Sequence, residues 1–251
     1  MDYTTQELMI IAAAREIHNN EVVFVGMRLP MVAYAVARLT HAPDAVGFFE
    51  CGVMRHQPAQ SLLYTMGDPA NQKSAAWLTG TLQLMGMLQA GKVHAGFIGG
   101  AQIDRFGNIN TSRIGKPGPG FTKLPGSGGA ADIAAMSQRL FSIMKHQRRR
   151  FVERVDYVTS TGYLDGGDSR QQAGLHHGGT TAVITDLGIL RPFGPNHELH
   201  LASWHPGITV AQIRQATGWD LQRLPDAEET NAPSKEELQA LKKVDPQGFW
   251  S

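Results

Sequence analysis

An acid and a thiol at the end of an apolar run are the residues of this sequence best suited to chemistry. Glu50 and Cys51, the chain's single cysteine, follow the run AVGFF and precede Gly52. The end of a buried strand is where α/β proteins place ligand sites, and partial desolvation makes a carboxylate more basic and more nucleophilic. Glu50 is therefore a candidate nucleophile or proton carrier. Cys51 is either a small packed side chain or a reactive thiol.

Two glycine-containing segments are the next candidates. One directly follows the apolar run that ends at Ile98, and the other, GSGGA, precedes a predicted helix. Glycines before a helix let backbone N–H groups converge on a phosphate or an oxyanion, although a tight loop without a ligand has the same sequence pattern. The second segment lacks the Lys-Ser/Thr of a P-loop and the spacing of a dinucleotide-binding motif. The candidate residues are Gly99, Gly100, Ala101, Gly128, Gly129 and Ala130.

Composition excludes several classes of function. The net charge is +1, from 23 basic and 22 acidic residues, so nothing favours nucleic-acid binding or membrane attraction. The histidines are scattered without a metal-ligand spacing, so no metal site and no permanently bound cofactor are predicted. No Gly-x-Ser-x-Gly elbow supports a serine hydrolase. One cysteine, no signal-like N-terminus and no long apolar run indicate a soluble cytoplasmic protein.

The elements that must position these residues alternate between strands and helices. This alternation predicts an α/β fold with a mostly parallel open sheet flanked by helices. A capping box, Thr4 to Glu7, begins the first helix. Helices are expected over residues 5–18, 30–39 and 131–145, and strands over residues 21–25, 45–49, 93–98 and 181–185.

The length of 251 residues favours one domain, 1–251. Residues 222–251 or so are rich in charge and are expected to form a peripheral C-terminal segment.

Several motifs together resemble one family. They are APD (42–44), ECG (50–52), FIGGAQIDRFGNIN (97–110), GSGGA (126–130) and RRRFVERVDYVTSTGYLDG (148–166). Their order and spacing resemble the B subunit of glutaconate CoA-transferase, a class I CoA-transferase, over nearly the whole chain up to about residue 220. The resemblance implies a CoA-transferase-like α/β fold and an A subunit as partner, in a heterodimer or heterotetramer.

The resemblance also implies a reaction. Glu50 would attack an acyl-CoA thioester to give an anhydride, the released CoA would form a glutamyl-CoA thioester, and a second acid would take the CoA. Segment 126–130 matches the oxyanion loop of the family, which makes Gly128, Gly129 and Ala130 the implied donors. The expected substrate is the CoA thioester of a short unsaturated dicarboxylic acid such as glutaconate.

One departure from the family pattern keeps alternatives open. Cys51 stands where the family usually has serine. A related two-subunit enzyme decarboxylates 3-methylglutaconyl-CoA to 3,3-dimethylacrylyl-CoA, in a route to isovaleryl-CoA, and Cys51 beside Glu50 would suit such a reaction. Another relative cleaves rings of steroid-derived CoA thioesters, and this chain resembles it less. A non-catalytic partner subunit is the third interpretation.

Overall fold

The computed structural model describes residues 3–175 and 177–251, which divide into two compact units. Unit 1 comprises the chain up to Ile98 together with Asn231–Ser251, and unit 2 comprises Gly99–Thr230. The elements of unit 1 are α1 (Thr5–Arg15), β1 (Val22–Phe24), α2 (Leu29–Leu39), β2 (Val46–Phe49), β3 (Val53–Arg55), α3 (Pro69–Gln72), β4 (Trp77–Leu78), α4 (Thr81–Gln89), β5 (Ala95–Ile98) and α8 (Lys235–Val244). The expectation of a single domain stays a prediction.

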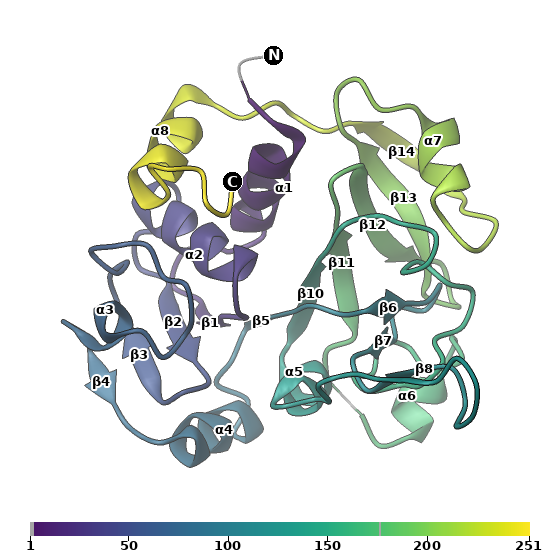
Figure 1. The fold of residues 1–251 in the computed structure, drawn as a ribbon, viewed down its shortest axis with the longest axis horizontal. Coiled ribbons are helices and arrows are strands. Elements are labelled where there is room, and N and C mark those ends of the chain that lie inside the picture. The colour runs from purple at the N-terminus through teal and green to yellow at the C-terminus, as the bar shows by residue number, and fades with distance from the viewer. Residues whose placement is uncertain (1–2, 176) are drawn as a thin grey trace. The chain divides into compact units, whose positions relative to one another are not determined.

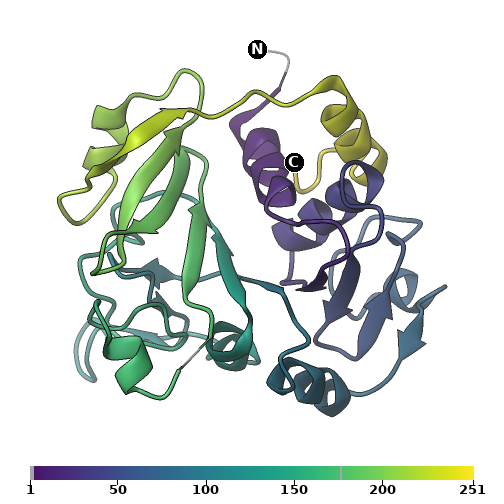
Figure 2. The ribbon, with the colours of Figure 1, turned by 180° about the vertical axis from the view of Figure 1, so that it is seen from behind.

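The helices of unit 1 begin where their sequences provide caps. The predicted capping box is confirmed, since Glu7 N donates to Thr4 Oγ1 at 3.0 Å and Thr4 N donates to the Glu7 carboxylate at 2.6 Å. Pro30 lies in the first turn of α2, where its missing N–H costs no hydrogen bond. α1, α2 and α8 pack together, as both ribbon views show (Figures 1 and 2).

The sheet of unit 1 has the strand order β5-β1-β2-β3-β4. β1 runs parallel to β5 and β2, whereas β3 and β4 are added by antiparallel pairing. The apolar runs that predict the strands are buried, with Phe24, Phe48 and Phe49 each 1 % exposed. The predicted strand 45–49 is thus confirmed as β2, and Glu50 follows its carboxyl end.

Unit 2 contains a second group of strands in the order β14-β13-β12-β11-β10. β10 and β11 are parallel, β11, β12 and β13 pair antiparallel, and β14 is parallel to β13 (Figure 2). The α/β fold class is confirmed, with helices flanking an open sheet of mixed strands. The elements are β6 (Gln102–Ile103), β7 (Ile109–Asn110), β8 (Arg113–Ile114), β9 (Thr122–Lys123), α5 (Ala130–Met136), β10 (Arg139–Ile143), α6 (Ser169–Gln172), β11 (Thr180–Ile184), β12 (Gly188–Phe193), β13 (Glu198–Trp204), α7 (Val210–Gln215) and β14 (Arg223–Glu229).

The helix predicted over residues 131–145 is wrong in its second half. α5 ends at Met136, Ser137 is extended with ψ 144°, and residues 139–143 form β10. Leu140 and Phe141 are both 0 % exposed. A strand buried on both faces has apolar residues at every position, so helical spacing matches it as well as a helix does.

The C-terminal residues contribute to both units. β14 pairs with β13 in unit 2, and α8 packs on α1 and α2 in unit 1. Arg15 holds the Glu237 carboxylate through two hydrogen bonds of 2.7 Å, one from Nε and one from Nη2. Asp245, 3 % exposed, accepts the N–H groups of Phe249, Trp250 and Ser251. These contacts order the C-terminal segment within unit 1.

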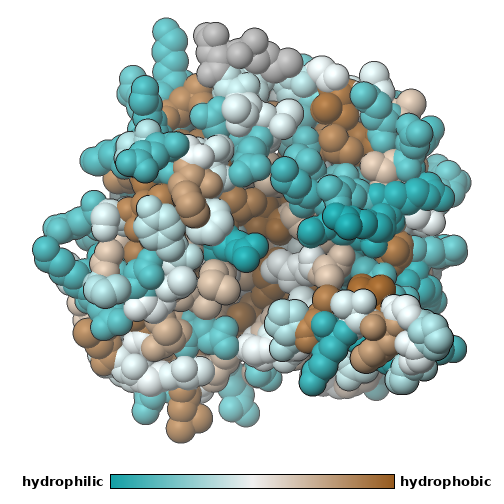
Figure 3. Space-filling model, in the orientation of Figure 1, coloured by the Kyte–Doolittle hydropathy of each residue, from teal (hydrophilic) through white to brown (hydrophobic). Residues whose placement is uncertain are grey.

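The surface of unit 1 exposes several large apolar side chains on adjacent elements. Trp77 and Leu78 of the edge strand β4 are 40 % and 57 % exposed, and Leu82 of α4 is 79 % exposed. Hydrophobic groups project over α4 in Figure 3. Such exposure is typical of a surface that another protein covers. None of the helices within the described residues has the length and apolar character needed to span a membrane.

Candidate active site

The parallel strands of unit 1 place Glu50 at the edge of the sheet where ligand sites form. β1, β2 and β5 run in the same direction, so their carboxyl ends share one edge. Phe24 is opposite Phe48, and Val25 N donates to Phe48 O at 2.8 Å. Glu50 is half-buried and directly follows Phe49, the last residue of β2. The predicted position of this carboxylate at a strand end is confirmed, whereas its catalytic role stays a prediction.

The turn that carries Glu50 explains the sequence Glu-Cys-Gly. Phe49 of β2 is opposite Val53 of β3, which leaves residues 50–52 as a short hairpin loop closed by the Gly52 N–H donating to Phe49 O at 2.9 Å. Gly52 has φ +96°, which favours glycine. A Cβ here would lie 2.1 Å from Thr79 O. The glycine is therefore required by the turn, and the acid and thiol occupy the two positions that precede it.

The segment after β4 anchors this turn from outside. Thr79 N donates to Gly52 O at 2.8 Å, and Thr81 Oγ1 donates to the backbone carbonyl of Glu50 at 2.9 Å. Thr81 is the first residue of α4, so the start of that helix fixes the backbone of Glu50. One hydrogen bond to Glu50 and one to Gly52 thus fix the turn that carries the carboxylate.

Cys51 is exposed and its thiol donates to Met66 O, with Sγ and the oxygen 3.1 Å apart. Partial burial raises the pKa of the Cys51 thiol above its ordinary value, and the charge of Glu50 raises it further, while backbone N–H groups act in the opposite direction. The thiol is therefore protonated at neutral pH. Since the thiolate is the reactive nucleophile, Cys51 is suited to donate a hydrogen bond or a proton rather than to attack a thioester.

Arg55, which the sequence analysis did not select, organises the loop beside Cys51. The residue is 1 % exposed and its guanidinium donates to the carbonyl oxygens of Gln57 at 2.9 Å and Lys73 at 2.8 Å. Asn71 Nδ2 in turn donates to Met66 O at 2.7 Å, the same oxygen that accepts from Cys51. The position was detectable in principle, because Arg55 falls on the buried face of the alternating strand β3.

The first glycine segment lies at the start of unit 2, after β5. Ala101 N donates to Asn110 O at 2.9 Å, so this N–H is engaged within the unit. A Cβ on Gly100 would lie 2.4 Å from Ile109 Cγ2, which explains that glycine by close packing against β7. Gly99 is exposed and a Cβ there would meet nothing within 4 Å. A substrate contact by these residues stays a prediction.

The second glycine segment precedes α5 in unit 2. Gly128 has φ +50°, and Ala130 N donates to Ser127 O at 3.0 Å in the turn that begins the helix. The N–H of Ala130 is thus already hydrogen-bonded, which leaves Gly128 and Gly129 as the better candidates among the predicted oxyanion donors. The carbonyl of Gly129 accepts from Ile133 N at 2.9 Å. The role of Gly128, Gly129 and Ala130 as oxyanion donors stays a prediction.

Both glycine segments are tied to the same short stretch of unit 2. Asn110 O accepts from Ala101 N, and the next residue, Thr111, accepts from Gly126 N at 2.9 Å. The structure therefore brings the two segments together at the end of β7. Glu50 and Cys51, which are adjacent in the sequence, lie in unit 1. Among the described residues, no group of three or more histidine, cysteine, aspartate or glutamate side chains is placed to hold a metal ion.

Comparisons with known proteins point to one family. The profile described as Coenzyme A transferase matches residues 6–216. The chain is 40 % identical to the B subunit of 3-oxoadipate CoA-transferase from Pseudomonas knackmussii, over 97 % of this chain and 94 % of that protein. It is 33 % identical to the B subunit of glutaconate CoA-transferase from Acidaminococcus fermentans, over 98 % of this chain and 94 % of that protein.

Solved structures agree with the sequence comparisons. The crystal structure of glutaconate coenzyme A-transferase from Acidaminococcus fermentans superposes with a TM-score of 0.91 at 32 % identity, covering 99 % of this chain and 97 % of that one. The decarboxylase AibA/AibB superposes with a TM-score of 0.84 at 26 % identity, covering 99 % and 97 %. Variants of that decarboxylase with one cysteine replaced superpose equally well, with TM-scores of 0.84 and 0.85.

Proposed function

The chain belongs to the coenzyme A transferase family, and on that premise we propose that it is the B subunit of an enzyme that transfers CoA between carboxylic acids, one of them a short dicarboxylic acid. The observation that carries the proposal is the anchored turn that holds Glu50 at the carboxyl edge of the parallel strands. A carboxylate there meets the geometric requirement for covalent catalysis on a thioester.

Glu50 acts as the nucleophile in the proposed mechanism. Its carboxylate attacks the thioester carbonyl, the C–S bond breaks, and CoA leaves as a thiolate while an acyl-glutamyl anhydride forms. The thiolate then attacks the glutamyl carbonyl, which releases the first acid as a carboxylate and leaves a glutamyl-CoA thioester. A second carboxylate reverses these steps with its own acyl group. Backbone N–H groups of Gly128 and Gly129 are the proposed donors to the tetrahedral oxyanions.

The acyl group is proposed to be that of a short dicarboxylic acid. The two relatives reported above are named for 3-oxoadipate and glutaconate, which are both dicarboxylic acids. The relative with 40 % identity supports 3-oxoadipate, and the structure with a TM-score of 0.91 supports glutaconate. Both acids therefore belong in the first assay. The CoA thioester is a substrate, and no permanently bound cofactor is proposed.

An A subunit is the proposed partner, in a heterodimer or heterotetramer. The relatives are named as B subunits, and AibA/AibB carries two subunit names. The exposed apolar residues of β4 and α4 supply a surface suited to such a partner. We place the complex in the cytoplasm, with no nucleic acid or membrane as partner. Co-expression with an A subunit and measurement of the mass of the complex tests this pairing.

Decarboxylation of 3-methylglutaconyl-CoA is the second candidate function. The superposition with AibA/AibB and the protonated thiol of Cys51 beside Glu50 favour it. In this reaction the distal carboxylate leaves as carbon dioxide, the electron pair passes into the conjugated thioester, and a proton is returned to carbon. Cys51 is the proposed donor of that proton, with no anhydride on Glu50.

Product analysis separates the candidates. The complex with its A subunit is incubated with glutaconyl-CoA plus acetate, with acetyl-CoA plus 3-oxoadipate, and with 3-methylglutaconyl-CoA alone. CoA transfer predicts acetyl-CoA in the first mixture and 3-oxoadipyl-CoA in the second, and only when the acceptor acid is present. Carbon dioxide released from the third without an acceptor, together with no transfer in the first two, makes the protein a decarboxylase subunit. Full activity of Glu50→Ala and Cys51→Ala variants makes it a non-catalytic subunit.

A further inference from the structure

Arg28 has a backbone conformation that side chains other than glycine avoid. Its φ is +71° and its ψ is −118°, between β1 and the first turn of α2. These angles are close to the mirror image of the extended region, where a Cβ atom clashes with the backbone and glycine is the preferred residue. Strained non-glycine residues of this kind cluster at ligand-binding sites, because selection retains the side chain in spite of the strain.

The strand register places Arg28 and Glu50 at the same edge of the sheet of unit 1. Phe24 is opposite Phe48 and Val25 N donates to Phe48 O at 2.8 Å, so β1 and β2 end at the same edge of the sheet, with Gly26 and Glu50 each two residues beyond that pair. Gly26 is held tightly there, since a Cβ on it would lie 2.4 Å from Phe97 O. Arg28 follows two residues later, at the same edge of the sheet. Arg28 and the Glu50 turn therefore follow strands that end at one edge of the sheet, which is the placement that contact with a shared ligand requires.

The guanidinium of Arg28 is available for a ligand. The side chain is exposed and makes no hydrogen bond or ion pair with any residue that the structure describes. Two other arginines of unit 1 are engaged, Arg15 with Glu237 and Arg55 with the carbonyl groups of its loop. A guanidinium presents its N–H donors in a planar fork that matches the two oxygens of a carboxylate.

We propose that Arg28 binds the distal carboxylate of the acyl group while Glu50 faces the thioester end, so that Arg28 selects dicarboxylic over monocarboxylic acyl groups. The inference rests on the proposed function for the class of substrate, and it holds for transfer and for decarboxylation alike. The phosphates of CoA are less suitable ligands, because the pantetheine arm separates them from the reacting sulfur by far more than the length of an arginine side chain. The distal carboxylate of a short diacid lies within that length.

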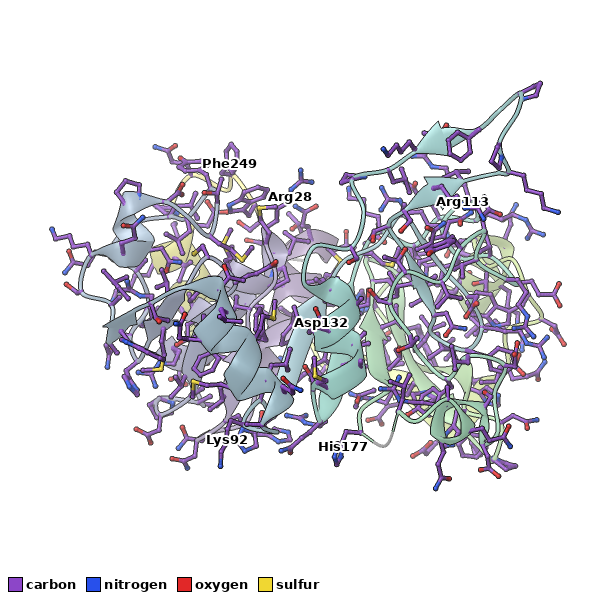
Figure 4. All side chains as sticks on the ribbon, turned by 90° about the horizontal axis from the view of Figure 1, so that it is seen from below. Arg28, Lys92, Arg113, Asp132, His177 and Phe249 are labelled. Carbon is purple, nitrogen blue, oxygen red and sulfur yellow. The ribbon has the colours of Figure 1, made fainter. Side chains whose placement is uncertain are left out.

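The test compares two thioesters that differ only at the distal end. Glutaryl-CoA carries the carboxylate, and valeryl-CoA has a methyl group in its place. Calorimetric titration of the complex with its A subunit gives the Kd of each for the wild type, Arg28→Gln and Arg28→Gly. Lys92→Gln is the matched control, because Lys92 is an exposed cation that lies at the edge of unit 1 opposite to Arg28 (Figure 4).

The two Arg28 variants are expected to weaken glutaryl-CoA binding by about 10- to 100-fold, the usual range for a hydrogen bond to a charged group. Valeryl-CoA binding should change by about twofold at most, as for an ordinary surface substitution. Lys92→Gln should alter neither Kd. Arg28→Gly removes the backbone strain as well as the charge, so it should fold at least as stably as the wild type and still lose the discrimination.

Two results would overturn the inference. An equal loss of affinity for both thioesters would mean that Arg28 contacts the CoA moiety or supports the fold. Unchanged affinity for both would mean that Arg28 contacts no part of the substrate. The proposed function is judged separately, by CoA transfer in the wild-type complex. Discrimination that depends on Arg28 in a complex without transfer activity would leave the carboxylate contact standing and refute the transferase reaction.

Discussion

Replacing Gly52 by alanine should displace the turn that carries Glu50. Gly52 has φ +96°, and a Cβ on it would lie 2.1 Å from Thr79 O and 2.8 Å from Thr79 C. Both of these atoms belong to the backbone, so no side-chain rotation relieves the clash. Either the turn or the segment that anchors it must move, and the Thr79 N–H to Gly52 O hydrogen bond of 2.8 Å lies between them.

The size of the effect follows from these contacts. An alanine held at such a positive φ costs roughly 1–3 kcal/mol. Loss of the anchoring hydrogen bond adds about 0.5–1.5 kcal/mol. The sum, about 1.5–4.5 kcal/mol, is a large part of the roughly 5–15 kcal/mol that stabilises a typical domain. A shift of Glu50 by about 1 Å would also lower kcat by about a hundredfold.

Thermal unfolding and transfer kinetics measure both consequences. For a chain of this size the destabilisation corresponds to a Tm lower by roughly 5–15 °C. Gly86→Ala is the matched control, because Gly86 lies inside α4 and a Cβ on it would meet nothing within 4 Å. That variant should gain about 0.5–1 kcal/mol of stability. A Gly52→Ala variant with the Tm and kcat of the wild type would refute the account of the turn.

Three further predictions concern buried or shielded groups. Since burial raises the pKa of the Cys51 thiol, its alkylation by iodoacetamide should reach its midpoint at a higher pH than that of a cysteine in an unstructured peptide, and a midpoint at or below that of the peptide would contradict the assigned environment. Arg55→Met leaves the carbonyl groups that Arg55 contacts, such as those of Gln57 and Lys73, without donors. It should therefore lower the free energy of unfolding by about 3 kcal/mol or more and speed Cys51 alkylation at fixed pH. An unchanged alkylation rate would show that Arg55 does not shape the environment of the thiol. Burial lowers the pKa of His146 to about 3, so the unfolded chain binds a proton that the folded chain excludes below about pH 6.5. The free energy of unfolding should then fall by up to about 1.4 kcal/mol for each unit of pH decrease between about pH 6.5 and pH 3. The His146→Gln variant should show a flatter dependence of stability on pH, and equal slopes for the variant and the wild type would contradict the assignment.

The part of the site that could be predicted from the sequence is the part encoded locally. The apolar run before Glu50 indicates a buried strand, and β2 ends at Phe49 as expected. The glycine after the acid and thiol indicates a turn, and its φ of +96° fits that interpretation. Both depend on neighbouring residues alone, which is why prediction from the sequence succeeds there.

The features that were missed depend on contacts between distant residues. Residues 139–143 form a strand because parallel pairing with β11 buries both faces, and spacing alone does not distinguish this from a helix. Arg55 is buried because carbonyl groups of residues 57–73 surround it. The positive φ of Arg28, +71°, occurs in the connection between β1 and α2. The alternation of β3 places Arg55 on its buried face, whereas no local pattern indicates the conformation of Arg28.

The most direct test of the central claim is to trap the covalent intermediate on Glu50. The complex with its A subunit is incubated with an acyl-CoA substrate and hydroxylamine, and the peptide that contains Glu50 is analysed by mass spectrometry. The account predicts a hydroxamate on Glu50, formed only when acyl-CoA is present, together with loss of transfer activity. An unmodified Glu50 in an enzyme that remains fully active would contradict the assignment of this carboxylate as the nucleophile.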